Sequence, residues 1–237
     1  MQKGAEMFAS VLTATILGIE VCPIQVEADV SDGLPSFTMV GFPSAQVKEA
    51  QDRVRTALRN NGISLPPKRI TVNLAPADIK KEGAGFDMPV AAALLAAAGM
   101  IDPKLLQGVM MAGEISLNGE IHSMSGILPM VIKAREEGCR FCMVPFGNLR
   151  EGRLVKDIPV IGVKNLTEMM EYLKHPEAFQ DAPEVKERPL EQEIVDFGDI
   201  CGQESVRRAV EIAVSGFHNI LLIGPPGAGA CVKIRLS

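Results

Sequence analysis

Aromatic residues are scarce in this sequence of 237 residues, which has no tryptophan and one tyrosine. Hydrophobic residues still make up 47%, so a core has to be built from aliphatic side chains, alanine and methionine. No apolar run reaches the 18 or more residues that cross a bilayer. The short apolar run at 7–17 alternates with Thr13 and Thr15 and lacks a small-residue cleavage site, which favours a strand over a signal peptide. We expect a globular, cytoplasmic protein with no membrane partner.

Metal ligands are sparse as well. The three histidines lie far apart, and the five cysteines are an odd number. Cys139 and Cys142 have CxxC spacing, but no second pair or nearby histidine completes a zinc site. We expect reduced cysteines rather than redox chemistry, and no metal site.

The net charge of −5 is unevenly distributed. Residues 44–69 hold six basic side chains against two acidic ones, whereas 176–199 hold eight acidic side chains against two basic ones and include three prolines. Such an acidic, proline-containing stretch is typical of a solvated linker. We expect a first domain at 1–175, a linker at 176–196 and a second segment at 197–237.

The segment from Arg69 to Met100 is expected to form the centre of the first domain. It opens with the alternation of a buried strand, continues through a polar loop and then becomes a helix that Asp87 should cap and Gly99 should end. Residues 88–98 carry no charged or hydrogen-bonding side chain. A helix that is apolar on every side and this short is buried in a core.

Strands come first in this domain and then alternate with helices, which predicts an α/β (α+β) mixed sheet with helical cover. The helix beginning at Ser44 should bury Val47, Ala50, Val54, Ala57 and Leu58 on one face. We expect strands at 7–17, 19–29, 36–40, 69–74, 108–112, 141–144 and 159–163, a return at 119–122 after a turn at 118–119, and helices at 44–60, 87–98, 126–137 and 166–174.

Two basic features admit both a binding and a solvated interpretation. Arg53, Arg55 and Arg59 lie off the buried helix face and form a face that either contacts a nucleic-acid backbone or is solvated, without aromatic residues for base stacking. The loop with Lys80, Lys81 and Glu82 precedes two glycines at a helix start. It is either an anion contact or a solvated loop.

A glycine-rich loop follows the buried-strand pattern at 218–223. A strand running into such a loop is the setting of a phosphate-binding Walker A motif, which requires a lysine and then a serine or threonine. Ala230 and Cys231 occupy those two positions, and the sequence ends six residues later, so we expect a degenerate motif that does not hydrolyse ATP. Its residues are Gly224, Pro225, Pro226, Gly227, Ala228 and Gly229.

Four long stretches carry a family resemblance: GLPSFTMVGFPSAQVKEAQDRVRTALRNNG, NLAPADIKKEGAGFDMPVAAALLAA, AGEISLNGEIHSMSGILPMVIKAREEG and DICGQESVRRAVEIAVSGFHNILLIGPPGAG. They resemble the ComM (YifB) family of magnesium-chelatase-like AAA+ ATPases. The resemblance implies a first domain with the fold of ribosomal protein S5 domain 2 and the Lon protease domain, followed by the start of a P-loop AAA+ module, incomplete here. It implies that full-length members bind ATP and Mg²⁺, form hexamers and drive DNA branch migration in natural transformation. Ile200 and Gly202 match the segment that flanks adenine.

The resemblance to Lon raises the hypothesis of a peptidase, which can be tested on the residues at the two catalytic positions. Gly85 stands where Lon has its serine nucleophile, and Leu128 stands where Lon has the activating lysine, so we expect no peptidase activity. The expected function is that of an N-terminal, catalytically incomplete part of a ComM-like ATPase, truncated naturally or otherwise. The alternatives are a stand-alone interaction or oligomerisation module, for which self-association is expected, and a magnesium-chelatase subunit.

Overall fold

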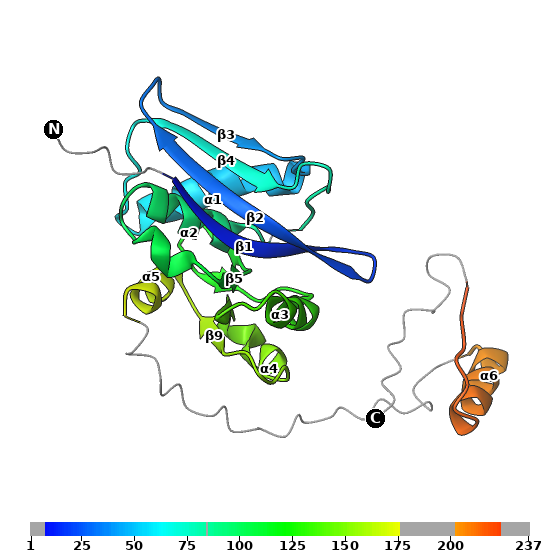
Figure 1. The fold of residues 1–237 in the computed structure, drawn as a ribbon. Coiled ribbons are helices and arrows are strands. Elements are labelled where there is room, and N and C mark those ends of the chain that lie inside the picture. The colour runs from blue at the N-terminus through cyan, green and yellow to red at the C-terminus, as the bar shows by residue number, and fades with distance from the viewer. Residues whose placement is uncertain (1–7, 84, 176–201, 224–237) are drawn as a thin grey trace. The chain divides into compact units, whose positions relative to one another are not determined.

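The computed structural model describes residues 8–83, 85–175 and 202–223 (Figure 1). The chain divides into two compact units, 1–185 and 186–237. The division falls within the stretch 176–196 that the sequence predicts to be a linker. The two units are treated separately below.

The first unit is built on a seven-stranded sheet with the order β3-β4-β2-β1-β5-β8-β9. Four neighbouring pairs are parallel, and the pairs β1–β2 and β2–β4 are antiparallel. The sheet is therefore mixed, as the sequence predicts, and mostly parallel. A separate two-stranded hairpin joins β6 and β7. The strands are β1 (Phe8–Leu17), β2 (Glu20–Ser31), β3 (Ser36–Val40), β4 (Arg69–Ala75), β5 (Val109–Met111), β6 (Glu114–Ile115), β7 (Ile121–His122), β8 (Phe141–Pro145) and β9 (Val160–Val163).

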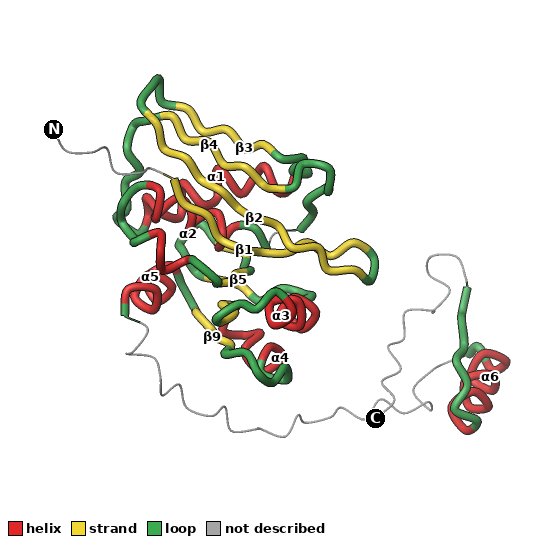
Figure 2. The backbone as a smooth tube through the Cα atoms, in the orientation of Figure 1, coloured by secondary structure: helices red, strands yellow, loops and turns green. Residues whose placement is uncertain are grey.

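Helices pack on both faces of this sheet (Figures 1 and 2). Along β5, Val109 and Met111 belong to one buried cluster while Met110 belongs to another, because alternate side chains of a strand point to opposite faces. The first cluster contains α1, α2 and α5, and the second contains α3 and α4. The helices are α1 (Ala45–Asn60), α2 (Asp87–Ala97), α3 (Ile127–Glu136), α4 (Leu149–Gly152) and α5 (Leu166–Lys174), with short 3-10 turns at Pro103–Leu106 and Phe146–Asn148.

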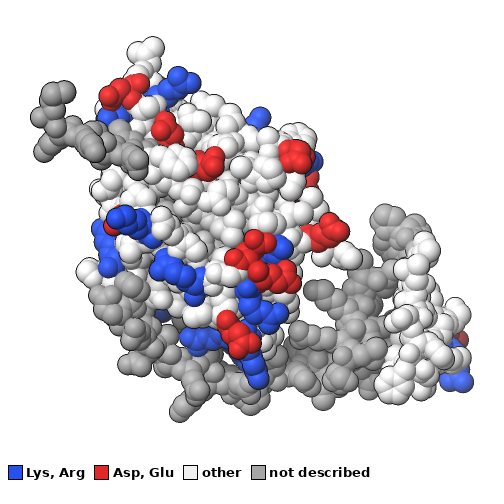
Figure 3. All heavy atoms as spheres, in the orientation of Figure 1, with Lys and Arg blue, Asp and Glu red and all other residues white. Residues whose placement is uncertain are grey.

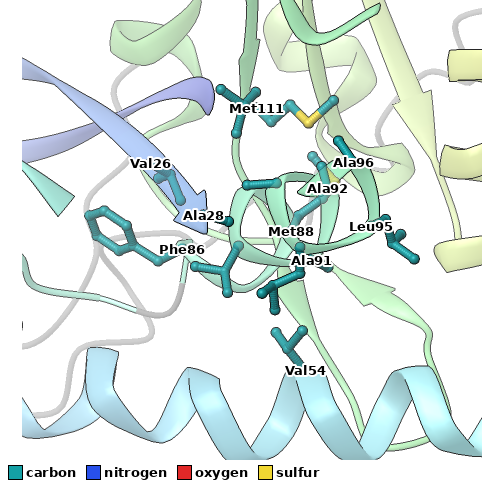
Figure 4. Close-up of a cluster of buried hydrophobic side chains, with 14 of the residues drawn as sticks. Val26, Ala28, Val54, Phe86, Met88, Ala91, Ala92, Leu95, Ala96 and Met111 are labelled. Atoms are coloured by element: carbon teal, nitrogen blue, oxygen red, sulfur yellow. The ribbon is translucent and has the colours of Figure 1, made fainter. Parts of the chain in front are cut away.

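Helix α2 is the centre of the larger cluster, as predicted (Figure 4). Every residue from Asp87 to Ala97 is buried, and Gly99 adopts the left-handed conformation that ends the helix. Alanine and leucine are strong helix formers, and the small alanines let neighbouring backbones approach closely. An apolar helix of this length is therefore used here to fill the space between the sheet and α1.

Helix α1 also follows its sequence pattern. The Ser44 hydroxyl accepts a hydrogen bond from the backbone N–H of Val47 at 3.3 Å and caps the helix. The buried residues of α1 are the five that the apolar spacing predicts. The turn from β3 into α1 needs glycine, because Gly41 has a φ of 93° and an added Cβ would lie 2.2 Å from the carbonyl oxygen of Leu74.

The second unit contains α6 (Glu204–Ser215), on which Val210 and Ala213 are buried. The strand expected at 218–223 is not formed, since these residues have no regular secondary structure. A strand needs a hydrogen-bonding neighbour, and no described residue provides one here. Leu221 and Ile223 are 82% and 89% exposed, one of the outcomes expected for an apolar strand without partners.

Candidate functional site

The residues of interest in the first unit gather around α1 and the start of α2. Asp87 does not cap its own helix, contrary to the prediction. Phe86 holds the N-cap position, and the Asp87 carboxylate accepts hydrogen bonds from elsewhere in the sequence. Arg53 Nε and Nη2 donate to its two oxygens at 2.9 Å each, and the backbone N–H of Ile115 donates at 3.1 Å. The carboxylate thus joins α1, α2 and β6.

This ion pair is asymmetric in its access to water. The Asp87 side chain is completely buried, whereas the Arg53 side chain retains 22% of its exposed surface. Burial raises the pKa of Asp87, and the hydrogen bonds from Arg53 and Ile115 oppose that rise. The hydrogen bond to Asp87 in turn raises the pKa of Arg53. The pair therefore holds α1 and α2 together, and each partner favours the charged form of the other.

The sequence predicts that Lys81 either contacts an anion or is solvated, but its side chain is buried in the protein. Its Nζ donates to the carbonyl oxygen of Pro76, and its backbone exchanges hydrogen bonds with Phe42 and Ser44. Desolvation lowers the pKa of Lys81. The neighbouring Lys80 forms an ion pair with Glu82 at 2.5 Å.

One backbone N–H of the first turn of α2 has a protein partner, since Met88 donates to the carbonyl oxygen of Gly113. Gly113 in turn donates to the carbonyl oxygen of Gly85. Lys81 is turned inward, so its ammonium group does not face a ligand. Anion contact at this loop stays a prediction that rests on the backbone N–H groups of the helix start.

Gly85, which corresponds to the Lon serine, lies beside the side chain of Met124, and Leu128 is the position that corresponds to the Lon lysine. A Cβ at residue 85 would come within 2.7 Å of Met124 Cε. Leu128 and Met124 both pack against the smaller hydrophobic cluster. Apolar side chains thus fill the region where the family resemblance would place a dyad, and the absence of peptidase activity remains a prediction.

The three arginines predicted to share one basic face are separated by the structure. Arg53 is held by Asp87, while Arg55 and Arg59 line a groove beside β3. Successive residues of a helix are about 100° apart, so positions 53 and 55 face nearly opposite directions, while 55 and 59 lie one turn apart on one side. Nucleic-acid contact stays a prediction for all three arginines, and the structure adds that Arg53 is already bound to Asp87 and Glu49.

This groove, called the β3 groove below, has a volume of about 320 Å³. Sequence reasoning found its arginines but missed its walls, which come from the start of β3 and the loop between α1 and β4. Arg55 and Arg59 are exposed and have no hydrogen bond or ion pair to any residue that the structure describes. The groove is lined by Pro35, Ser36, Phe37, Arg55, Arg59, Ile63, Ser64, Leu65, Pro66, Pro67, Lys68 and Ile70.

Cofactor sites depend largely on residues outside the described part of the chain. Ile200 and residues 224–229 lie outside it, so the predicted nucleotide contacts have no geometry here. Gly202 is described and has a φ of 77°, directly before α6. Within the described residues, no cluster of three histidine, cysteine or acidic side chains is arranged to hold a metal, and no helix has the length and apolarity to cross a membrane.

Comparison with known proteins places these features in a family. The chain is 40% identical over 227 residues to the protein YifB of Salmonella typhimurium and 38% identical over 225 residues to Competence protein ComM of Haemophilus influenzae, in each case over 93% of this chain. A family model described as subunit ChlI of Mg-chelatase matches residues 26–148, more than half of the chain. The chain belongs to the ComM/YifB-type magnesium-chelatase-like family.

Membership of the magnesium-chelatase-like family extends into the second unit, since a model described as magnesium chelatase, subunit ChlI, matches residues 196–236. The chain spans only 43–44% of the length of these two relatives. A more distant similarity links it to Lon protease 2 of Bacillus subtilis, with 28% identity over 128 residues, which cover 54% of this chain and 23% of that protein. This gives limited support to the Lon-like fold predicted for the first unit.

Proposed function

We propose that this chain corresponds to the N-terminal part of a ComM-like ATPase of the magnesium-chelatase-like family, whose whole protein acts in ATP-dependent DNA branch migration. The observation that carries this proposal is the 38% identity to Competence protein ComM, which runs over 93% of the chain and so includes both units. In this proposal the first unit has the S5 domain 2-like, Lon-like fold, and residues 197–237 begin an incomplete P-loop module. DNA and a homo-hexamer are the proposed partners of the whole protein.

We further propose that this chain is catalytically incomplete. A Walker A lysine reaches the β- and γ-phosphates, and the following serine or threonine hydroxyl is a ligand of Mg²⁺. Ala230 has no donor group, and a Cys231 thiol is a soft ligand that does not suit Mg²⁺. The residues present therefore do not fit an ATP–Mg²⁺ complex that is poised for hydrolysis.

The test compares the chain with the variant Ala230→Lys/Cys231→Thr. We expect no Mg²⁺-dependent ATP hydrolysis by the chain, with or without DNA, and tighter binding of a fluorescent ATP analogue by the variant. A matched variant with Gly229→Val added should lose that gain, because a side chain there obstructs the phosphate loop. Hydrolysis by the unmodified chain that Gly229→Val abolishes would refute catalytic incompleteness.

A second candidate is a stand-alone interaction or oligomerisation module. The observation that favours it is that residues 8–175 contain both main hydrophobic clusters and a complete seven-stranded sheet. Sedimentation of the full chain over a range of concentrations tests it. Self-association at micromolar concentration without nucleotide supports the module, and a monomer under all conditions contradicts it.

A further inference from the structure

The β3 groove lies at the start of β3, and β3 is a free edge of the main sheet. In the described part of the chain, β3 has one hydrogen-bonded neighbour, β4, and nothing pairs with its other side. The backbone N–H of Ser36 donates to Lys68, which precedes β4. Because alternate residues of a strand bond to the same neighbour, the backbone N–H and C=O groups of Phe37 and Met39 point to the free edge. An exposed edge of this kind is a template for a further strand.

The two arginines stand beside this edge at a spacing that suits an added strand. Helix α1 follows β3 in the sequence and precedes the parallel strand β4, so it runs back along β3. Residues four apart on a helix have Cβ atoms about 5–6 Å apart. Side chains on one face of an extended strand repeat about every 6.6–6.8 Å. Arg55 and Arg59 can therefore face two alternate side chains of one extended segment, and their charge selects carboxylates.

We propose that the β3 groove binds an extended acidic peptide segment of a partner protein, which pairs with the free edge of β3 and places carboxylates at alternate positions against Arg55 and Arg59. The apolar part of the groove, which includes Ile63, Leu65 and Pro66, contacts the apolar atoms of the peptide between those carboxylates. This binding mode takes its affinity from main-chain hydrogen bonds and its specificity from alternate side chains. It does not depend on ATP or on the catalytic state of the second unit.

Nucleic acid is the other ligand class with the right charge, and two observations favour the peptide. The unpaired strand edge matches a peptide backbone, and Phe37 packs against the core instead of presenting a free ring for base stacking.

The experiment uses the full chain and a fluorescently labelled peptide in which glutamate alternates with valine over eight residues. We expect saturable binding that weakens about tenfold in the variant Arg55→Ala/Arg59→Ala, which corresponds to about 1.4 kcal/mol for two partly solvated ion pairs. The matched control is Arg153→Ala, an exposed arginine on a different part of the first unit whose side chain has no hydrogen bond or ion pair to a described residue, and this variant should bind like the unmodified chain. A peptide with lysine in place of glutamate should not bind.

N-methylation of the peptide distinguishes strand pairing from charge attraction alone. Methylating alternate backbone nitrogens on one edge of the peptide should abolish binding, while methylating those on the other edge should leave it intact, because only one edge faces β3. Equal effects of the two patterns would overturn strand addition. Binding of a thymidine oligonucleotide that requires Arg55 and Arg59, without binding of the acidic peptide, would overturn the proposal in favour of nucleic acid, and binding of neither ligand would overturn it outright.

Discussion

The Arg53–Asp87 pair offers the sharpest test of how the first unit is held together. Replacing Arg53 with methionine keeps much of the side-chain volume but removes both donors that lie 2.9 Å from the Asp87 oxygens. The remaining donor, the N–H of Ile115 at 3.1 Å, then faces a carboxylate with no access to water. Leaving one charge of a buried pair uncompensated costs about 3–5 kcal/mol. This is a large part of the about 5–15 kcal/mol that stabilises a typical domain.

A second substitution should rescue the first. In Arg53→Met/Asp87→Asn, the buried group is neutral, and its amide oxygen can still accept from Ile115, so we expect the double variant to be more stable than Arg53→Met by about 2 kcal/mol. Asp87→Asn alone should cost less than Arg53→Met, because Arg53 retains 22% exposure and can be solvated when it loses its partner. Urea unfolding followed by far-UV circular dichroism suits a chain without tryptophan.

The pH dependence of the free energy of unfolding gives an independent test of the buried-charge argument. Burial already raises the pKa of Asp87, and loss of the opposing arginine raises it further. A carboxyl whose pKa is higher in the folded state binds protons more tightly there, so stability falls as pH rises through that range. The deficit of Arg53→Met relative to the double variant should therefore be larger at pH 7 than at pH 5 and shrink as the pH falls towards about 4. Additive effects of the two substitutions, or a deficit that is constant with pH, would refute the buried-charge argument.

Two further predictions concern buried ionisable groups. Burial raises the pKa of Cys142 to about 12, so at pH 8 only about one Cys142 thiol in 10⁴ is a thiolate. Cys142 should therefore be alkylated more slowly than the half-buried Cys139, as measured by mass spectrometry with the urea-unfolded chain as control. Equal alkylation rates of the two cysteines in the folded protein would contradict the burial of Cys142. Desolvation lowers the pKa of Lys81, so the unfolded chain binds the proton more tightly, and the stability of the unmodified chain relative to Lys81→Met should increase as pH rises towards about 10.4. A relative stability that stays flat between pH 8 and 10 would show that the amine is solvated.

The parts of the fold that the sequence predicts well are those with a strong local pattern. The buried face of α1 can be read from apolar spacing and a serine cap, and the burial of α2 follows from its lack of any charged residue between 88 and 97. The partners of Asp87 cannot be read this way, because Arg53 and Ile115 lie 34 and 28 residues away. A local rule assigns an aspartate before an apolar run to its own helix cap, and here a tertiary ion pair overrides that rule.

The other features that the sequence does not predict depend on which strands pair with one another. Residues 218–223 have the composition of a buried strand, but composition does not supply the neighbour that a strand needs. The β3 groove likewise depends on β3 being at the edge of the sheet, which follows from the pairing order and not from the residues of β3 themselves. The arginines of α1 could be found from the sequence. That Arg53 turns to the core while Arg55 and Arg59 stay at the surface follows only once the position of Asp87 is known.

That division makes stability and binding separable on a single helix. Arg53 faces Asp87 in the interior, whereas Arg55 and Arg59 face the β3 groove, about 160° and about 120° around the helix axis from Arg53. Substitutions at the exposed arginines remove no hydrogen bond or ion pair among the described residues, so they should change the free energy of unfolding by less than about 0.5 kcal/mol. Arg53→Met should do the reverse, lowering stability while leaving the groove residues in place. Loss of peptide binding in Arg55→Ala/Arg59→Ala at unchanged stability therefore reports on the groove, and a parallel loss of stability would show that the two sides of α1 are coupled.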